Sequence, residues 1–171
     1  ASLLFLDADA ARNRLKANPW IADATILKLF HDRLHIAVTE RCAFALWQKD
    51  GRVSVVSRDG VMVEPFVAPH VAHLPLVVGE GANVRAAEFL SVMNSYPDLR
   101  DQVHAYVLVA DRRWNLRLKN GMDIRLPEAE PAEAIEALLT LDKDKKLLSR
   151  DILAIDLRIR DRVTVRLSDQ A

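Results

Sequence analysis

The clearest pattern in the chain is a strict alternation of apolar and polar residues over positions 114–118 and again over positions 122–126. A period of two is the spacing of one face of a β-strand, and Asn120-Gly121 between the two runs is a favoured hairpin turn. These positions therefore predict a β-hairpin with one apolar face, which packs against a core, and one charged face.

A second alternating hairpin is predicted near the end of the sequence, with its turn close to Asp161. Because successive side chains of a strand point to opposite faces, each of its strands divides into an inward and an outward set. The expected inward residues are Ile155, Leu157, Ile159, Val163, Val165 and Leu167, and the expected outward residues are Asp156, Arg158, Arg160, Thr164, Arg166 and Ser168. We expect no later strand to cover the second of these strands.

Three helices are predicted from apolar spacing and from capping residues. The first begins at Asp7, whose carboxylate can accept the free N–H groups of the first turn. It ends at Asn18-Pro19, because a residue before proline is pushed out of the helical region. The second runs over Asn83–Ser95, and the third runs from Pro131 to about Leu141, with proline in its favoured first position.

Shorter strands account for much of the remaining chain, and the turn pairs Asp50-Gly51 and Asp59-Gly60 separate three of them into a meander. The expected strands are Ala22–Phe30, Arg33–Arg41, Phe44–Gln48, Arg52–Ser57, Val61–Glu64 and Leu76–Val78. Helices and mainly antiparallel strands in this order indicate an α+β fold and not a doubly wound sheet. From Ala43 the pattern changes to closely spaced strands with hairpin turns, which predicts a domain boundary near Arg41–Ala43.

The composition narrows the range of functions. Half of the 171 residues are apolar, which is enough for a sizeable core, and 24 basic residues balance 24 acidic ones. Zero net charge argues against tight nonspecific binding to nucleic acid, which depends on many phosphate contacts. The triplet Arg112-Arg113-Trp114 could stack on bases, but Trp114 falls in register with the apolar face of its strand. We therefore interpret Trp114 as a core residue.

Nothing in the sequence points to catalysis. The five glycines form no phosphate-binding loop, and neither His-Glu-x-x-His nor Gly-x-Ser-x-Gly occurs. The single cysteine, Cys42, is interpreted as a half-buried filler and not as a nucleophile. His70 and His73 could approach each other as metal ligands, but a structural zinc site takes about four ligands. We expect no enzymatic activity, no cofactor and no metal.

Four segments of the chain together resemble one protein family. They are Asn-Pro-Trp-Ile-Ala-Asp-Ala at 18–24, Leu-His-Ile-Ala-Val-Thr-Glu-Arg at 34–41, Asp-Arg-Arg-Trp-Asn-Leu at 111–116, and Asp-Leu-Arg at 156–158 followed by Val-Thr-Val-Arg-Leu at 163–167. In this order they resemble the periplasmic part of the bacterial cell-division family FtsQ, in its alphaproteobacterial form. The Pro-Trp and Thr-Glu-Arg pieces are shared with related polypeptide-transport-associated (POTRA) domains, and the other two are more discriminating.

The resemblance implies a POTRA domain followed by a β domain. A POTRA domain normally opens with a strand and a helix before the helix at Asp7, so residues 1–41 would be an incomplete POTRA domain. Residues 42–171 would be the β domain, a mainly antiparallel sheet with two helices packed on it. The resemblance further implies a non-enzymatic divisome scaffold at the periplasmic face of the inner membrane, anchored by one N-terminal helix that is absent here.

The family also implies the partners FtsB and FtsL, with the partner strand added to the last strand of the β domain. This agrees with the residue pattern, since a strand with a free edge can accept another strand. The expected partner-binding residues are Arg113, Arg158, Ile159, Arg160, Val163, Thr164, Val165, Arg166, Leu167 and Ser168. Arg113 or its neighbour Arg112 matches an arginine that the family presents beside this sheet, and Ile159 stands where the family often has an aromatic residue.

Three alternatives stay open at this point. The outward arginines could simply form a solubilising strand face. The chain could be a POTRA-type chaperone or assembly module for other envelope proteins, which internal repeats would support, but no repeat is found. A periplasmic hydrolase would need a pocket that gathers His70, His73 and a carboxylate.

Overall fold

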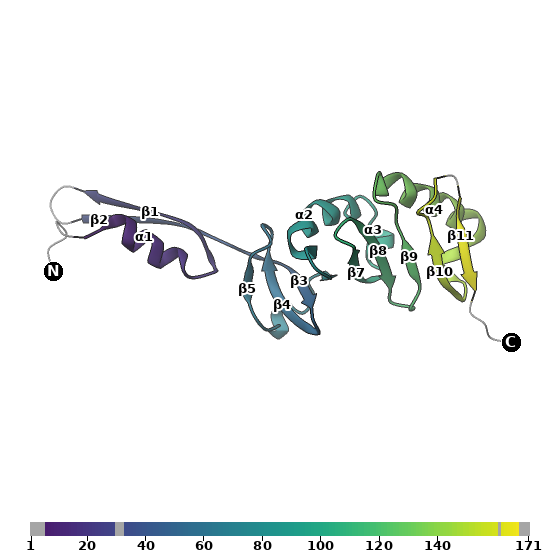
Figure 1. The fold of residues 1–171 in the computed structure, drawn as a ribbon, viewed down its shortest axis with the longest axis horizontal. Helices are drawn as coiled ribbons and strands as arrows, with labels where there is room; N and C mark the ends of the chain where they lie inside the picture. The colour runs from purple at the N-terminus through teal and green to yellow at the C-terminus, as the bar shows by residue number, and fades with distance from the viewer. Residues whose placement is uncertain (1–5, 30–32, 161, 168–171) are drawn as a thin grey trace.

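The structure is a computed structural model that describes residues 6–29, 33–160 and 162–167 (Figure 1). Its helices are α1 (Ala8–Lys16), α2 (Ala82–Met93), α3 (Pro97–Arg100) and α4 (Pro131–Lys145), with 3₁₀ turns at Pro69–Val71 and Leu147–Ser149. Its strands are β1 (Ile21–Leu29), β2 (Arg33–Glu40), β3 (Ala43–Lys49), β4 (Arg52–Ser57), β5 (Met62–Glu64), β6 (Leu76–Val78), β7 (Val103–Val109), β8 (Arg113–Leu118), β9 (Asp123–Arg125), β10 (Ile152–Asp156) and β11 (Thr164–Leu167). The predicted strand residue Phe30, the turn residue Asp161 and the site residue Ser168 lie outside the described residues.

Strands β3 to β11 form one nine-stranded sheet, called here the large sheet, in the order β11-β10-β9-β8-β7-β6-β3-β4-β5. Neighbouring strands are mostly antiparallel, and the parallel pairs are β3 with β6, β6 with β7, and β9 with β10. The predicted α+β fold with a mainly antiparallel sheet is therefore confirmed. The strand order places β11 at one edge of the large sheet and β5 at the other.

Helices α2 and α4 bury their apolar sides in a core shared with the large sheet. Phe89 of α2 stacks on Trp114 of β8 with the ring centroids 4.8 Å apart, and Ile135 and Leu138 of α4 are fully buried. The alternating residues of β8 and β9 complete this core, since Trp114 is 7% exposed and Ile124 is 0% exposed. The predicted hairpin, the two helices packed on the sheet and the interpretation of Trp114 as a core residue are confirmed.

Helix α1 and the two-stranded sheet of β1 and β2 form a separate part, called here the N-terminal unit. The helix begins as predicted, because the Asp7 carboxylate accepts the N–H groups of Asp9 and Ala10 at 3.0 and 3.1 Å. Such an N-cap contributes about 1 kcal/mol to helix stability. Helix α1 covers the hairpin only in part, so Ile36 and Val38 remain 47% and 43% exposed.

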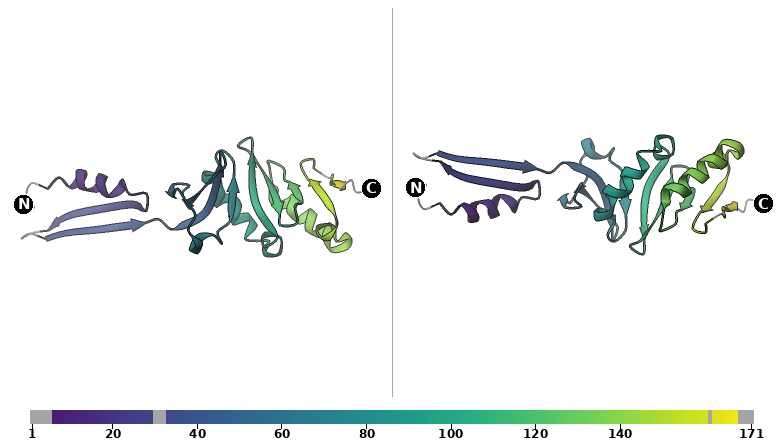
Figure 2. Two further views of the ribbon diagram at one scale, coloured as in Figure 1. Left: turned by 90° about the horizontal axis from the view of Figure 1, so that it is seen from below. Right: turned by 90° about the horizontal axis from the view of Figure 1, so that it is seen from above.

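The N-terminal unit extends away from the large sheet along the long axis of the molecule (Figures 1 and 2). Strand β2 ends at Glu40 and β3 begins at Ala43, so the covalent link between the two sheets is Arg41-Cys42. This break falls within the stretch where the sequence predicts a domain boundary. The extents of the two domains, 1–41 and 42–171, stay a prediction.

Several local features differ from the sequence predictions. Strand β7 lies inside the large sheet, and its sequence shows no alternation because apolar residues occupy both of its faces, although only the face of Tyr106 and Leu108 lies in the core. Helix α3 was missed because Pro97 starts a new helix in its first position instead of only ending α2. Helix α4 continues past Leu141 to Lys145. Cys42, expected to be half-buried, is exposed because it lies in the link outside both sheets.

Candidate partner-binding surface

Strand β11 is the most accessible strand edge of the large sheet. It pairs with β10 alone, in the antiparallel register Ala154 to Arg166, Ile155 to Val165 and Asp156 to Thr164. No strand in the described part of the chain pairs with its other side. Every second N–H and C=O group of β11 therefore points away from β10 and can bond to an added strand.

The inward face predicted for the C-terminal hairpin is only half right. Ile155 and Leu157 are buried, at 0% and 5% exposure, but Ile159 is 61% exposed because it lies beyond the end of β10 and the period of two no longer applies. Val165 and Leu167 pair across from core residues of β10, yet they are 36% and 65% exposed. The prediction that Ile159 faces inward is wrong, whereas Val165 and Leu167 lie on the predicted face but are exposed, because the cover over the core ends before the outermost strand.

The residues of β11 thus have two different surroundings. Val165 and Leu167 continue the apolar face of the sheet but are open to solvent, and Val163 just before the strand is half-buried against the core. Thr164 and Arg166 alternate with them and are exposed. In the described part of the chain Arg166 forms no ion pair, so its charge is available to a partner.

Arg158 is already engaged within the chain. Its guanidinium Nε donates to both carboxylate oxygens of Asp156 at 2.8 and 3.0 Å, and its main-chain N–H donates to the same carboxylate at 3.1 Å. The hydrogen bonds from Arg158 are the main reason that the pKa of Asp156 is held below its ordinary value. Arg125 lies 3.8 Å from this carboxylate. An acidic partner residue would have to compete with Asp156.

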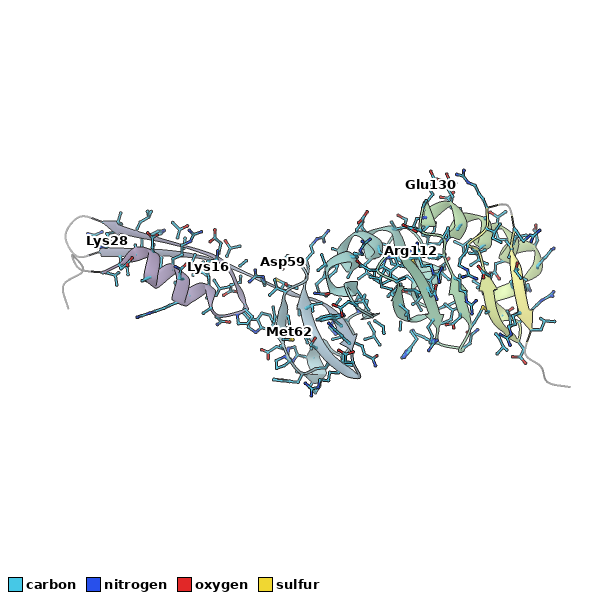
Figure 3. All side chains as sticks on the ribbon, viewed as in Figure 1. Lys16, Lys28, Asp59, Met62, Arg112 and Glu130 are labelled. Carbon is cyan, nitrogen blue, oxygen red and sulfur yellow. The ribbon has the colours of Figure 1, made fainter. Side chains whose placement is uncertain are left out.

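Arg160 is likewise paired. Its guanidinium lies 2.6 Å from Glu130 and 3.4 Å from Glu133, at the start of α4, where Figure 3 labels Glu130. All three side chains are more than half exposed, and exposed ion pairs of this kind contribute about 0–1 kcal/mol. Arg160 therefore holds the loop after β10 to α4 only weakly, and its release to a partner costs little.

Arg113 is not brought next to β11. It begins β8, and strands β9 and β10 lie between β8 and the edge, so about 14 Å separates β8 from β11 at the usual strand spacing. Its Nε is buried without a hydrogen-bond partner, and Trp114 beside it points into the core. Arg113 thus lies on the opposite face of the sheet from the helices, with an unused donor. The neighbouring Arg112 lies 3.8 Å from Glu128.

A groove of about 600 Å³ runs between the first half of α4 and the loop that joins β10 to β11. Its lining includes Glu130, Glu133, Ala134, Leu157, Ile159 and Val163. Sequence reasoning singled out Ile159 and Val163 but missed the groove, because the groove depends on where α4 packs. The sequence gives no local signal for it, since the alternation of apolar and charged residues continues through Ile159 and Arg160.

The described residues contain no group of three or more His, Cys, Asp or Glu side chains that could hold a metal ion. His70 and His73 are both exposed, on and just after the 3₁₀ turn at Pro69–Val71. Within the same described part of the chain, no helix is long and apolar enough to cross a membrane.

Comparison with known families decides the relationship. The family described as cell division protein FtsQ/DivIB, C-terminal, matches residues 45–158. The chain belongs to the FtsQ/DivIB family. The FtsQ-type POTRA domain matches residues 1–41, within the N-terminal unit and the link that follows it. The resemblance drawn from the sequence motifs is therefore confirmed.

Curated members of the family match almost the whole chain. The cell division protein FtsQ of Bradyrhizobium diazoefficiens is 55% identical over 171 residues, which are 100% of this chain and 50% of that protein. The FtsQ of Rhizobium radiobacter is 40% identical over 170 residues, which are 99% of this chain and 81% of that protein. This chain thus spans half the length of the Bradyrhizobium protein.

One solved structure is also similar, with a TM-score of 0.40 and 12% identity over 66% of this chain and 99% of that one. It is the major extracytoplasmic domain of the trans isomer of the bacterial cell division protein DivIB from Geobacillus stearothermophilus.

Proposed function

We propose that this chain is a non-enzymatic scaffold of the division apparatus that recruits FtsB and FtsL by accepting a strand at the edge of β11. Family membership supports the role in division. The observation that carries the mechanism is the position of β11 at an open edge of the large sheet. A scaffold of this kind needs an accessible binding edge and no catalytic group.

Strand addition uses the two kinds of groups that β11 offers. Main-chain hydrogen bonds to the open edge contribute roughly 0.5–1.5 kcal/mol each in net terms, whatever the partner sequence. Apolar side chains of the added strand cover Val165 and Leu167, which are exposed in the free chain. Arg166 and Thr164 on the other face select the partner, with Arg166 pairing to an acidic side chain.

The remaining predicted residues take part to different degrees. Ile159 and Val163 line the groove beside α4 and extend the apolar surface beyond the strand. Arg158 and Arg160 contribute less than Arg166, because each must first leave a carboxylate of this chain. Arg113 contacts the partner only if the partner continues across the open face of the sheet as far as β8, and its buried Nε must first become accessible.

The same proposal covers the rest of the protein. Residues 1–41 are part of a POTRA domain that receives other divisome proteins, and residues 42–171 are the β domain that holds FtsB and FtsL. The full-length protein is anchored by a single N-terminal helix in the inner membrane, with this chain on the periplasmic side at the division site.

The test is a calorimetric titration of the chain with a periplasmic FtsB fragment, using two adjacent proline substitutions. Because N–H groups alternate in direction along a strand, one of Val165 and Arg166 donates to β10 and the other points to the open edge. Val165→Pro and Arg166→Pro therefore remove one inner and one outer donor. The outer substitution is the one that leaves the melting temperature unchanged.

We expect the unmodified chain to bind with a Kd of about 1 μM or tighter, and the outer proline variant to bind at least about tenfold more weakly while remaining folded. Unchanged affinity in that folded variant would exclude strand addition at β11. Absence of binding by the unmodified chain would contradict the assignment of FtsB as a partner of this segment.

A further inference from the structure

The link between the N-terminal unit and the large sheet is spanned by one half-buried arginine side chain. The Nη1 group of Arg41 donates to the main-chain carbonyls of Pro19 and Ile21, at 3.0 and 2.8 Å. Its Nε donates to the carboxylate of Asp59, in the turn between β4 and β5, at 3.0 and 3.3 Å. One guanidinium therefore binds both parts of the molecule at the point where the chain passes from one to the other.

Both ends of this contact are fixed in place. The Asp59 carboxylate also accepts a hydrogen bond from the Ser57 hydroxyl, which helps to fix its orientation. The main-chain N–H of Arg41 donates to the carbonyl of Trp20 at 2.7 Å. The Arg41 side chain is only 17% exposed, although the Asp59 side chain is 54% exposed, so the pair is partly shielded from solvent.

A second contact crosses the same joint at a different place. The indole N–H of Trp20 donates to Glu64 of β5 at 2.8 Å, and the ring packs against a small buried cluster. That cluster consists of Leu46, Val55 and Val63 of the large sheet. Asp59 lies in the turn before β5 and Glu64 is the last residue of β5, so the two contacts hold the large sheet at two separate points; Figure 3 labels Asp59 at this joint.

We propose that Arg41 is a positioning residue that, together with Trp20, locks the orientation of the N-terminal unit relative to the large sheet. Two domains joined by a short link and a small interface move relative to each other by default. Two directional contacts beside the link remove this rotation, because a turn about the link would break both. The N-terminal unit and the β11 edge, at opposite ends of the molecule, would then meet their partners at one fixed separation. This inference does not depend on which partner binds β11.

Distance measurement between two spin labels tests the lock. Lys28→Cys in β1 and Glu88→Cys in α2 place one exposed label in each part, in a chain where the native thiol is removed by Cys42→Ser. We expect one narrow distance distribution for this labelled chain. Arg41→Ala should widen it at least about twofold, as expected for two domains free to move. Arg12→Ala is the matched control, since the Arg12–Asp23 ion pair lies wholly within the N-terminal unit.

A wide distribution in the labelled parent chain, or an unchanged width in a folded Arg41→Ala variant, would overturn the lock. Circular dichroism shows whether that variant is folded. If it is not, Asp59→Asn removes the charge of one contact with little change in volume, and Trp20→Phe removes the indole donor of the other but keeps an aromatic ring; the two together must then widen the distribution. Widening with Arg12→Ala as well would also contradict the proposal, because that pair does not cross the joint.

Discussion

The two edges of the large sheet differ in how far they are covered by the rest of the chain. Strand β5 is short, is followed directly by Pro65, and its last residue Glu64 accepts the indole N–H of Trp20 from the N-terminal unit. Strand β11 at the other edge is covered by nothing that the structure describes, and Leu167 is 65% exposed there. Open edges invite pairing with other chains, and proteins normally block those that serve no purpose.

This difference indicates which edge of the large sheet a partner strand is expected to bind. At β5 a partner would meet a proline, which lacks a donor, and would have to displace Trp20 from its apolar cluster. At β11 it would meet free main-chain groups and uncovered apolar side chains. We call the β5 edge the closed edge and the β11 edge the open edge. The four predictions below test this contrast, from the largest expected effect to the smallest.

The closed edge should be important for stability. Trp20→Ala removes the hydrogen bond to Glu64 and the packing on the cluster around Val55, so we expect a loss of about 2 kcal/mol in the free energy of unfolding, measured with urea. Phe66→Ala is the control in the same region, because Phe66 is 62% exposed and should change stability by less than about 0.5 kcal/mol. Equal effects of the two substitutions would contradict this reading of the closed edge.

At the open edge, a substitution should lower the affinity for the partner and leave the stability of the chain nearly unchanged. Leu167→Lys adds a charge to an exposed position, so we expect the free energy of unfolding to change by less than about 0.5 kcal/mol. Affinity for the FtsB fragment should fall about tenfold, because a buried apolar contact is lost in the complex. Val84→Lys, at an equally exposed apolar residue of α2, should leave affinity unchanged. A similar loss with both variants would mean that the effect is not specific to β11.

Charge selection at the open edge should be a smaller effect. Arg166→Glu reverses the one outward charge of β11 without a partner in the described chain, and we expect about a fivefold loss of affinity at low salt, or about 1 kcal/mol. The loss should shrink as salt is added, since exposed charges are screened. Arg150→Glu is the control, at an exposed arginine outside the strand. A salt-independent loss would point to disturbed packing instead of charge pairing.

The smallest effect concerns pH. Hydrogen bonds from Arg158 hold the pKa of Asp156 below its ordinary value. A carboxyl whose pKa is lowered by folding stabilises the fold above its unfolded-state pKa of about 3.9, and this contribution is lost as the pH falls through the folded-state value. We therefore expect the stability advantage of the wild type over Asp156→Asn to be present near neutral pH and to diminish as the pH falls below the unfolded-state pKa of about 3.9. A difference in the free energy of unfolding between the two proteins that does not change with pH would contradict this role of Asp156.

Much of the fold follows from local pattern. The hairpin β8–β9 and the helix cap at Asp7 each depend on residues that are close in sequence, so alternation and capping rules were sufficient. Strand β7 could not be found in this way, because it carries apolar residues on both faces and its sequence therefore shows no alternation.

The candidate site was predictable in part for the same reason. The strand and its outward Arg166 follow from the period of two. The exposure of Ile159 and the pairing of Arg160 with Glu130 depend on where α4 packs, which no local pattern specifies. The distance of Arg113 from β11 depends on the strand order, which is also a long-range property.

Amide hydrogen exchange of β11 with and without the FtsB fragment tests the central claim most directly. In the free chain, the N–H groups over residues 164–167 that point away from β10 should exchange fast and the others slowly. Binding should slow the fast set while leaving β5 unchanged. Protection that appears elsewhere while the outward amides of β11 continue to exchange fast would contradict strand addition at this edge.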